Sequence, residues 1–188
     1  HSRTPLDLAS HRLPVEPRRG CRREVNGPNA RAYCDMDGVL TDFESRFEHF
    51  SGMHPQAYEK AKGSPAFWEL IDNKIGVRFW VGMSFMPEGQ RLWDFIKPYQ
   101  PDLLTSPSRH NNSRLGKNLW VKNNLNPKPK VIFAYSAVKQ RYANETSILI
   151  DDKPSNINEW TAKGGIAIRC KNGNVDHVIE ELKKLGYE

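Results

Sequence analysis

The 188-residue sequence has few cysteines and no long apolar run. Its three cysteines are odd in number and lack CxxC spacing, which excludes a disulfide framework or a zinc knuckle and favours a reducing, cytoplasmic compartment. No segment approaches the roughly 20 apolar residues that a membrane-spanning helix requires, and no signal-peptide core follows the first residues. We therefore expect no membrane partner.

Positive charge is unevenly distributed along the chain. There are 28 lysines and arginines against 22 acidic residues, a net charge of +6. Residues 1–31 contribute +4, with seven arginines, four prolines and no aromatic residue. This composition predicts a disordered basic leader over residues 1–30, either native or a cloning remnant. Only this leader would give the chain a nucleic-acid partner, because the remaining residues carry just +2.

Short apolar runs alternate with amphipathic stretches after the leader. Each run is too short for a helix and does not alternate with polar residues, which is typical of strands buried on both faces. Helices are expected to start at Pro87 and, with Asn174 as the N-cap, near the end of the chain. The alternation predicts an α/β fold with a Rossmann-like, doubly wound parallel sheet. The five predicted strands are residues 31–35, 102–105, 130–134, 147–151 and 165–169.

Residues 44–99 interrupt this alternation with a helical, aromatic-rich segment. We expect it to fold as a small helical cap inserted after the first strand, leaving residues 31–43 and 100–188 as the core. Most of its aromatic side chains are expected to be buried. Two pairs in loop-like surroundings, Phe67–Trp68 and Phe79–Trp80, are instead candidates for stacking on a base.

Pairs of acidic residues follow two of the predicted strands. Asp35 and Asp37 come at the end of the first, and Asp151 and Asp152 at the end of the fourth. Alone, the first pair also fits a solvated acidic turn, and the second most often indicates a helix cap. The carboxyl ends of parallel strands share one crevice, however, and like charges held close together need a compensating cation or proton. Together the four acids predict a site for a hard cation, Mg2+ with several waters retained.

Polar groups at the end of the second strand are suited to a phosphate. Thr105 and Ser106 offer hydroxyls and backbone N–H groups there. Lys117 and Lys139 are candidates to neutralise the same phosphate. The alternatives are an ordinary polar turn and two surface lysines, although Lys139 follows a strand end as the other candidates do.

The order of these motifs resembles a known signature. DMDGVLTDF, LLTSPSR, Lys139 and ILIDDKPSN are similar to the four motifs of the haloacid dehalogenase (HAD) superfamily of phosphohydrolases. More narrowly, LLTSPSR with GKNLWVK and LIDDKPSNINEWTAKGGIAI resemble the 5'(3')-deoxyribonucleotidase family, including bacterial and phage members. The resemblance spans residues 32–186.

The resemblance implies a role for each motif. Asp35 would be the nucleophile that forms an aspartyl-phosphate, and Asp37 the general acid and then the general base. Mg2+ would lie between the Asp35 carboxylate, the Asp37 backbone carbonyl and the Asp151–Asp152 pair, whose direct ligand is left open. The residues implied to bind phosphate are Thr105, Ser106, Lys117 and Lys139.

The same resemblance implies a substrate pocket between core and cap. Aromatic side chains of the cap would surround the base, with polar residues after the phosphate turn nearby. The candidates are Phe43, Phe67, Trp68, Ser108 and Arg109.

Three functions fit these observations. The first is a Mg2+-dependent nucleotidase that dephosphorylates nucleoside monophosphates. The second keeps the chemistry but acts on polynucleotide ends or small phosphometabolites. The third is a non-catalytic module that binds nucleotides or nucleic acid. Base and sugar preference, 5' or 3' phosphate and the formation of a homodimer stay open.

Overall fold

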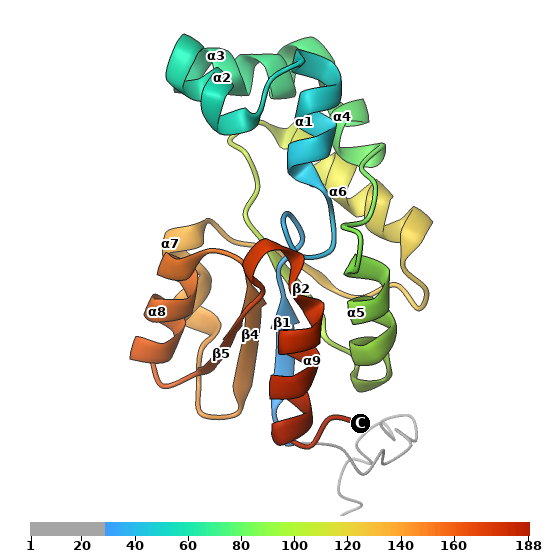
Figure 1. Cartoon of the computed structure of the whole chain (residues 1–188), viewed down its shortest axis with the longest axis vertical. Coiled ribbons are helices and arrows are strands. Elements are labelled where there is room, and N and C mark those ends of the chain that lie inside the picture. The colour runs from blue at the N-terminus through green and yellow to red at the C-terminus, as the bar shows by residue number, and fades with distance from the viewer. Residues whose placement is uncertain (1–28) are drawn as a thin grey trace, which may run out of the picture.

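The computed structural model describes residues 29–188, and its sheet confirms the expected fold class (Figure 1). Five strands, all parallel, hydrogen-bond in the order β3-β2-β1-β4-β5. Each lies within one residue of its predicted bounds. Except for Asn29 and Ala30, the predicted leader lies outside the described residues. The strands are β1 (Arg31–Cys34), β2 (Asp102–Thr105), β3 (Val131–Phe133), β4 (Ser147–Asp151) and β5 (Ile166–Arg169).

Helices connect the strands and form the region between β1 and β2. Among the described residues, no helix is both long enough and apolar enough to cross a membrane. The α-helices are α1 (Phe43–Ser51), α2 (Pro55–Lys62), α3 (Ser64–Glu69), α4 (Val77–Val81), α5 (Gly89–Ile96), α6 (Asn111–Asn124), α7 (Ser136–Lys139), α8 (Pro154–Ala162) and α9 (Val175–Lys184). The other helical elements are the π-helical η1 (Leu70–Ile75) and the 3-10 turns η2 (Lys97–Tyr99), η3 (Gln140–Tyr142) and η4 (Lys171–Gly173).

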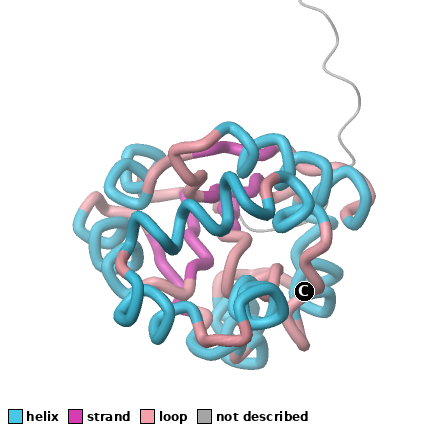
Figure 2. The backbone as a smooth tube through the Cα atoms, turned by 90° about the horizontal axis from the view of Figure 1, so that it is seen from above, coloured by secondary structure: helices cyan, strands magenta, loops and turns pink. Residues whose placement is uncertain are grey.

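Helices cover both faces of the sheet (Figure 2). Along β4, Ile148 and Ile150 belong to one apolar cluster and Leu149 to another, because successive side chains of a strand point to opposite faces. Val178 of α9 lies in the first cluster and Trp160 of α8 in the second. This two-sided burial explains why the strands read as continuous apolar runs.

The helices α1 to α4 lie beyond the carboxyl ends of the strands (Figure 1). Their interior is aromatic, with the Phe47 and Phe67 ring centroids 4.7 Å apart. α4 packs against α6, where a Cβ on Gly116 would lie 2.5 Å from the Cβ of Trp80. α5 packs instead against α9, beside the sheet. Below, cap denotes only residues 43–81, which form α1 to α4 and η1. The predicted division into a cap of residues 44–99 and a core stays a prediction.

The two predicted helix starts had different outcomes. Asn174 caps α9 as expected, since its side chain accepts a hydrogen bond from the His177 N–H at 3.1 Å. The predicted start at Pro87 is wrong, because α5 begins at Gly89. Residues 86–89 form a turn closed by a 2.8 Å hydrogen bond from the Gly89 N–H to the Met86 carbonyl, which holds Gly89 close to the backbone of Leu40.

Candidate active site

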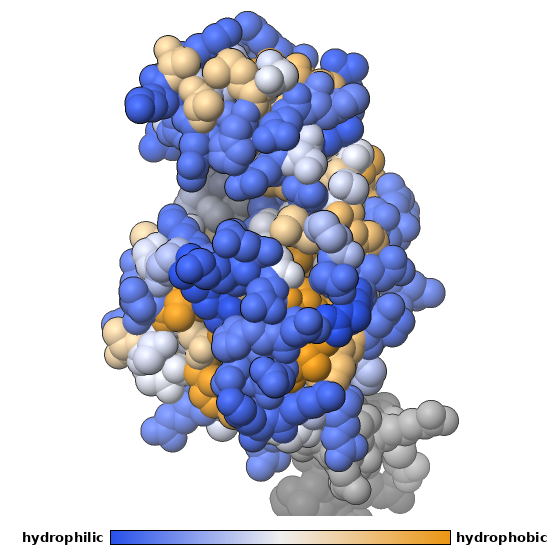
Figure 3. All heavy atoms as spheres, in the orientation of Figure 1, coloured by the Kyte–Doolittle hydropathy of each residue, from blue (hydrophilic) through white to orange (hydrophobic). Residues whose placement is uncertain are grey.

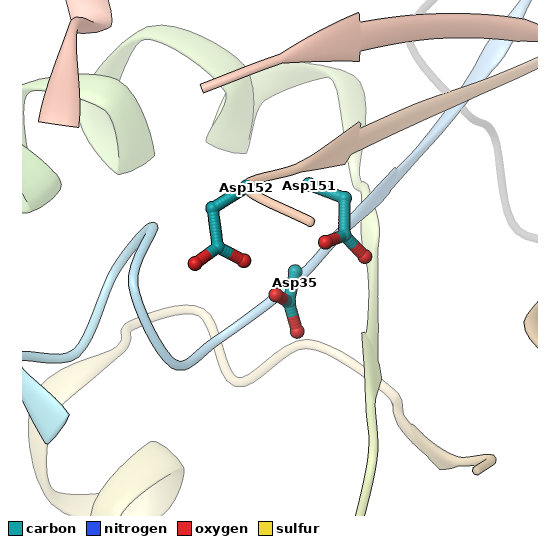
Figure 4. A group of neighbouring side chains, drawn as sticks. All are labelled: Asp35, Asp151 and Asp152. Atoms are coloured by element: carbon teal, nitrogen blue, oxygen red, sulfur yellow. The ribbon is translucent and has the colours of Figure 1, made fainter. Parts of the chain in front are cut away.

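Three carboxylates meet at the carboxyl ends of β1 and β4 (Figure 4). One oxygen from each of Asp35, Asp151 and Asp152 lies within 4.8 Å of the others. The sheet register produces this arrangement, because Cys34 pairs with Ile150 on the neighbouring strand and Asp35 and Asp151 are the next residues. The structure therefore brings together three of the four acids that the sequence placed at the cation.

Lys139 lies among these carboxylates. Its Nζ is 3.0 Å from Asp35 Oδ1 and 2.9 Å from Asp151 Oδ2, and the residue is buried. Burial lowers the pKa of Lys139, but the negative charges of Asp35 and Asp151 outweigh this effect, so the pKa is raised. The lysine is a permanent cation at the bottom of the site.

Asp151 is fully buried and is held by three donors. Its Oδ2 accepts from Lys139 and, at 3.0 Å, from Asn156 Nδ2, while its Oδ1 accepts from the Lys153 N–H at 2.9 Å. Asp152 is partly exposed and lines a cavity of about 240 Å³ together with Asp37. The two members of the pair thus have different surroundings: hydrogen bonds hold Asp151 in the interior, and Asp152 borders a cavity.

Crowding of these acids changes their proton affinity. Burial raises the pKa of Asp35 well above its ordinary value; the negative charge of Asp151 adds to the increase, and Lys139 opposes it. Burial likewise raises the pKa of Asp152 to about 6. A divalent cation with oxygen ligands would relieve this repulsion, so the donor set fits Mg2+.

Asp37 lies on the other side of the site, beside Lys117. Its Oδ2 is 3.0 Å from Lys117 Nζ, and its Oδ1 accepts a 2.8 Å hydrogen bond from Thr41 Oγ1. Lys117 also donates to Thr105 Oγ1 at 2.7 Å and to the Ser106 carbonyl at 2.8 Å. These contacts use all three N–H groups of Lys117, whereas Lys139 has two partners among the described residues and one donor left for a ligand.

Gly38 forms the turn between the two catalytic candidates and the first helix. Its φ of +84° is a left-handed conformation, which glycine adopts without strain. A Cβ at this position would overlap the carboxylate of Asp152. Glycine is therefore required both for the backbone turn and for the close approach of Asp152.

A larger cavity of about 530 Å³ opens between the helical cap and the sheet, where the surface is hollowed (Figure 3). Trp68, Ser108 and Arg109, three of the five predicted substrate residues, line it. Asp72 and Tyr135 line it as well and were not predicted from the sequence. Trp68 and Tyr135 are 40% and 46% exposed, which leaves much of each ring accessible to a ligand.

Asp72 supports the wall of this cavity. Its Oδ1 accepts a 2.8 Å hydrogen bond from Ser108 Oγ. Burial raises the pKa of Asp72, and the hydrogen bond from Ser108 partly offsets the increase. The contact links η1 of the cap with the loop after β2.

The other two predicted substrate residues, Phe43 and Phe67, do not line this cavity, although the Phe67 ring contacts that of Trp68 at a centroid distance of 5.0 Å. Phe67 is only 4% exposed and packs in the cap interior against Phe47. Phe43 is half-buried, with its ring centroid 5.3 Å from that of Phe79, and lines the smaller cavity beside Asp37 and Asp152.

Comparison with known proteins gives matches of fold. No family model and no curated protein matches the chain. A predicted phosphatase from Clostridium acetobutylicum matches with a TM-score of 0.54 at 12% identity, over 83% of this chain and 97% of that chain. A predicted HAD-like family hydrolase from Porphyromonas gingivalis matches with a TM-score of 0.48 at 13% identity, over 82% and 98%.

A third similar structure is a HAD family enzyme from Bacteroides thetaiotaomicron in complex with magnesium and inorganic phosphate. Its TM-score is 0.41 at 14% identity, over 77% of this chain and 96% of that chain. The first two proteins are named as a phosphatase and a hydrolase, and the third as a HAD family enzyme. At such low identity the Clostridium match shows a shared fold, and what each of these proteins binds is a property of that protein.

Proposed function

We propose that this protein is a Mg2+-dependent phosphatase of the HAD type that dephosphorylates nucleoside monophosphates, as a 5'(3')-deoxyribonucleotidase. One observation carries the proposal: Asp35, Asp151 and Asp152 have oxygens within 4.8 Å of one another at the carboxyl ends of adjacent parallel strands. Ligands of open α/β sheets bind at this edge. Lys139 beside the same acids supplies a cation for a phosphate oxygen.

The cation would be held by Asp35 together with the Asp151–Asp152 pair. All of the donors are carboxylate oxygens, which suit Mg2+ better than a softer metal. When bound, Mg2+ supplies positive charge that screens the nucleophile from the phosphate and polarises a phosphoryl oxygen.

The protein side chains divide the chemistry into two steps. In the first, a carboxylate oxygen of Asp35 bonds to phosphorus, the ester P–O bond breaks, and Asp37 gives its proton to the leaving oxygen. In the second, Asp37 takes a proton from water, the water oxygen bonds to phosphorus, and the bond to Asp35 breaks. Lys117 and Thr41 position the Asp37 side chain, which starts the first step protonated and regains its proton in the second.

The cavity between cap and sheet supports a mononucleotide as substrate. Its volume of about 530 Å³ lies within the common range for small-molecule pockets. Trp68 and Tyr135 offer rings on which a base can stack, and Ser108 and Arg109 offer polar groups. Polynucleotide ends and small phosphometabolites are the competing substrates.

A substrate panel tests the proposal. The purified chain is incubated with 5'- and 3'-monophosphates of ribo- and deoxyribonucleosides, a 3'-phosphorylated oligonucleotide and sugar phosphates, in Mg2+ or in EDTA. We expect Mg2+-dependent release of phosphate, fastest from mononucleotides and reduced at least about a thousandfold in Asp35→Asn. Asp94→Asn, which changes an exposed carboxylate on α5, is the matched control. If Asp35→Asn released phosphate as fast as the wild type, the proposed mechanism would be wrong. If the oligonucleotide were the preferred substrate, the proposal that mononucleotides are the substrate would be wrong.

A further inference from the structure

A second cavity lies at the opposite end of the sheet from the acids. Its volume is about 500 Å³, and residues at the starts of β1 and β2 and before β3 form its walls. Because Asp35 follows β1 and Arg31 begins it, the strand separates the two sites by roughly 13 Å. We call this the amino-end cavity, defined by Arg31, Trp93, Tyr99, Asp102, Lys128 and Lys130.

The walls of the amino-end cavity are rich in positive charge. Arg31, Lys97, Lys128 and Lys130 all line it, whereas Asp102 is the one acidic residue among the described lining residues. Asp102 is already paired with Arg31 at 2.6 Å. Within residues 29–188, no carboxylate lies within ion-pair distance of Lys128 or Lys130, so these two charges are available to an anion.

Trp93 contributes an apolar part of the wall. This side chain lines the cavity and is only 4% exposed. Its indole Nε1 is buried and makes no hydrogen bond among the residues described, so it offers no accessible donor to a ligand. The ring nevertheless borders the cavity, and its N–H signal is close enough to report on a bound molecule.

The remaining walls limit what such a ligand can be. Pro101, Pro127 and Pro129 and the ring of Tyr99 add stiff, apolar surfaces to these polar walls. The volume is larger than a bare phosphate needs and lies within the range of small-molecule pockets. The surroundings therefore suit a small organic molecule with an anionic group better than a simple ion.

We propose that the amino-end cavity binds a small phosphate-bearing organic ligand. Lys128 and Lys130 neutralise the phosphate, and the organic part of the ligand packs against Tyr99 and the prolines of the wall. The site is separate from the acidic cluster and does not depend on the proposed phosphatase function. Its ligand can bind while the active site is empty or occupied.

The Trp93 indole N–H itself reports on the test. In a two-dimensional 15N NMR spectrum of the full chain, the Trp93 signal is assigned as the one lost in Trp93→Phe. Inorganic phosphate, adenosine 5'-monophosphate and uncharged adenosine are then titrated in EDTA. We expect a saturable shift of the Trp93 signal with both phosphates, tighter for the nucleotide, and none with adenosine.

Charge variants distinguish a specific binding site from nonspecific electrostatic attraction. Lys128→Gln combined with Lys130→Gln should weaken binding at least tenfold, as read at Trp93. The matched control, Lys60→Gln combined with Lys163→Gln, removes the same charge from exposed positions outside the cavity and should leave binding unchanged.

Two outcomes would overturn the proposal: no saturable shift at millimolar phosphate, or equal weakening by both pairs of substitutions. Asp35→Asn should not alter the Trp93 titration. Failure of the catalytic proposal is therefore distinguishable from failure of this one.

Discussion

Lys139 and Asp35 lie 104 residues apart in the sequence, and their side chains meet at 3.0 Å in the interior. The same ammonium group contacts Asp151 at 2.9 Å. One buried cation thus stands between two buried anions from neighbouring strands. The stability of the fold and the charge of the site depend on the same side chain.

Replacing Lys139 with methionine should destabilise the protein strongly. The substitution keeps the length of the side chain but leaves two buried carboxylates uncompensated, a change that typically costs about 3–5 kcal/mol. Urea unfolding in EDTA measures the loss, and Mg2+ should recover part of it. Lys163→Met, at an exposed position after α8, should change the free energy of unfolding little. Equal effects of the two substitutions would show that Lys139 is not balancing the acids.

Asp152→Asn should stabilise the metal-free protein at neutral pH. The pKa of Asp152 is raised to about 6 by burial, against about 3.9 in an unfolded chain. Below pH 4 the carboxyl is protonated in both states; between about pH 4 and 6 the unfolded state ionises it while the folded state keeps the proton, which lowers the stability of the wild type. The advantage of the variant in EDTA should therefore grow between about pH 4 and 6 and then level off at about 2–3 kcal/mol.

Thermal unfolding of both proteins across this pH range, in EDTA and in excess Mg2+, provides the measurement. Mg2+ should stabilise the wild type and reduce the advantage of the variant, because the ionised carboxylate is then a ligand. A difference between the proteins that does not change with pH would contradict the assignment of this titration to Asp152.

Gly38→Ala should abolish activity, whereas Gly164→Ala should not. Both glycines have φ near +85°, at +84° and +86°, so each alanine strains the backbone by about 1–2 kcal/mol. A Cβ on Gly38 meets the Asp152 carboxylate, but one on Gly164 has no atom within 4 Å among the described residues. Phosphate release and unfolding should be measured on both variants. Similar activity losses would show that backbone strain, rather than displacement of Asp152, is responsible.

Trp68→Ala should raise KM about tenfold or more and leave kcat nearly unchanged. The ring lines the cavity and is 40% exposed, so its loss removes contact with the substrate without opening the core. Phe67→Ala should instead destabilise the cap by about 3–5 kcal/mol, because Phe67 is buried. Tyr142→Ala, at an exposed ring outside this cavity, serves as the control. A wild-type KM in Trp68→Ala would remove Trp68 from the substrate site.

The strands could be predicted because their signal is local. Runs such as Ile148–Ile150 are apolar without alternation, and both faces of the sheet are indeed covered. The meeting of Asp35 with Asp151 follows from the strand ends once a parallel sheet is assumed. The two pairs of acidic residues at strand ends are therefore sufficient to predict the carboxylate cluster from the sequence.

Asp72 and Tyr135 could not be found in this way. Asp72 lies in a π-helical segment, and its contact with Ser108 joins residues 36 positions apart. Tyr135 precedes a short helix and reaches the cavity only because the cap lies above it. No pattern in the sequence marks either residue, since each owes its position to the packing of the cap on the sheet.

Gly116 and Lys117 are adjacent in α6 and have different roles. Gly116 lets Trp80 of α4 lie directly against the helix, and Lys117 reaches Asp37 while its Nζ lies 5.0 Å from the Trp80 ring. The contact between α4 and α6 therefore lies next to the residue that holds Asp37. Because positions 116 and 117 are adjacent on one helix, a side chain at position 116 that pushed α4 away would also disturb the contact between Lys117 and Asp37.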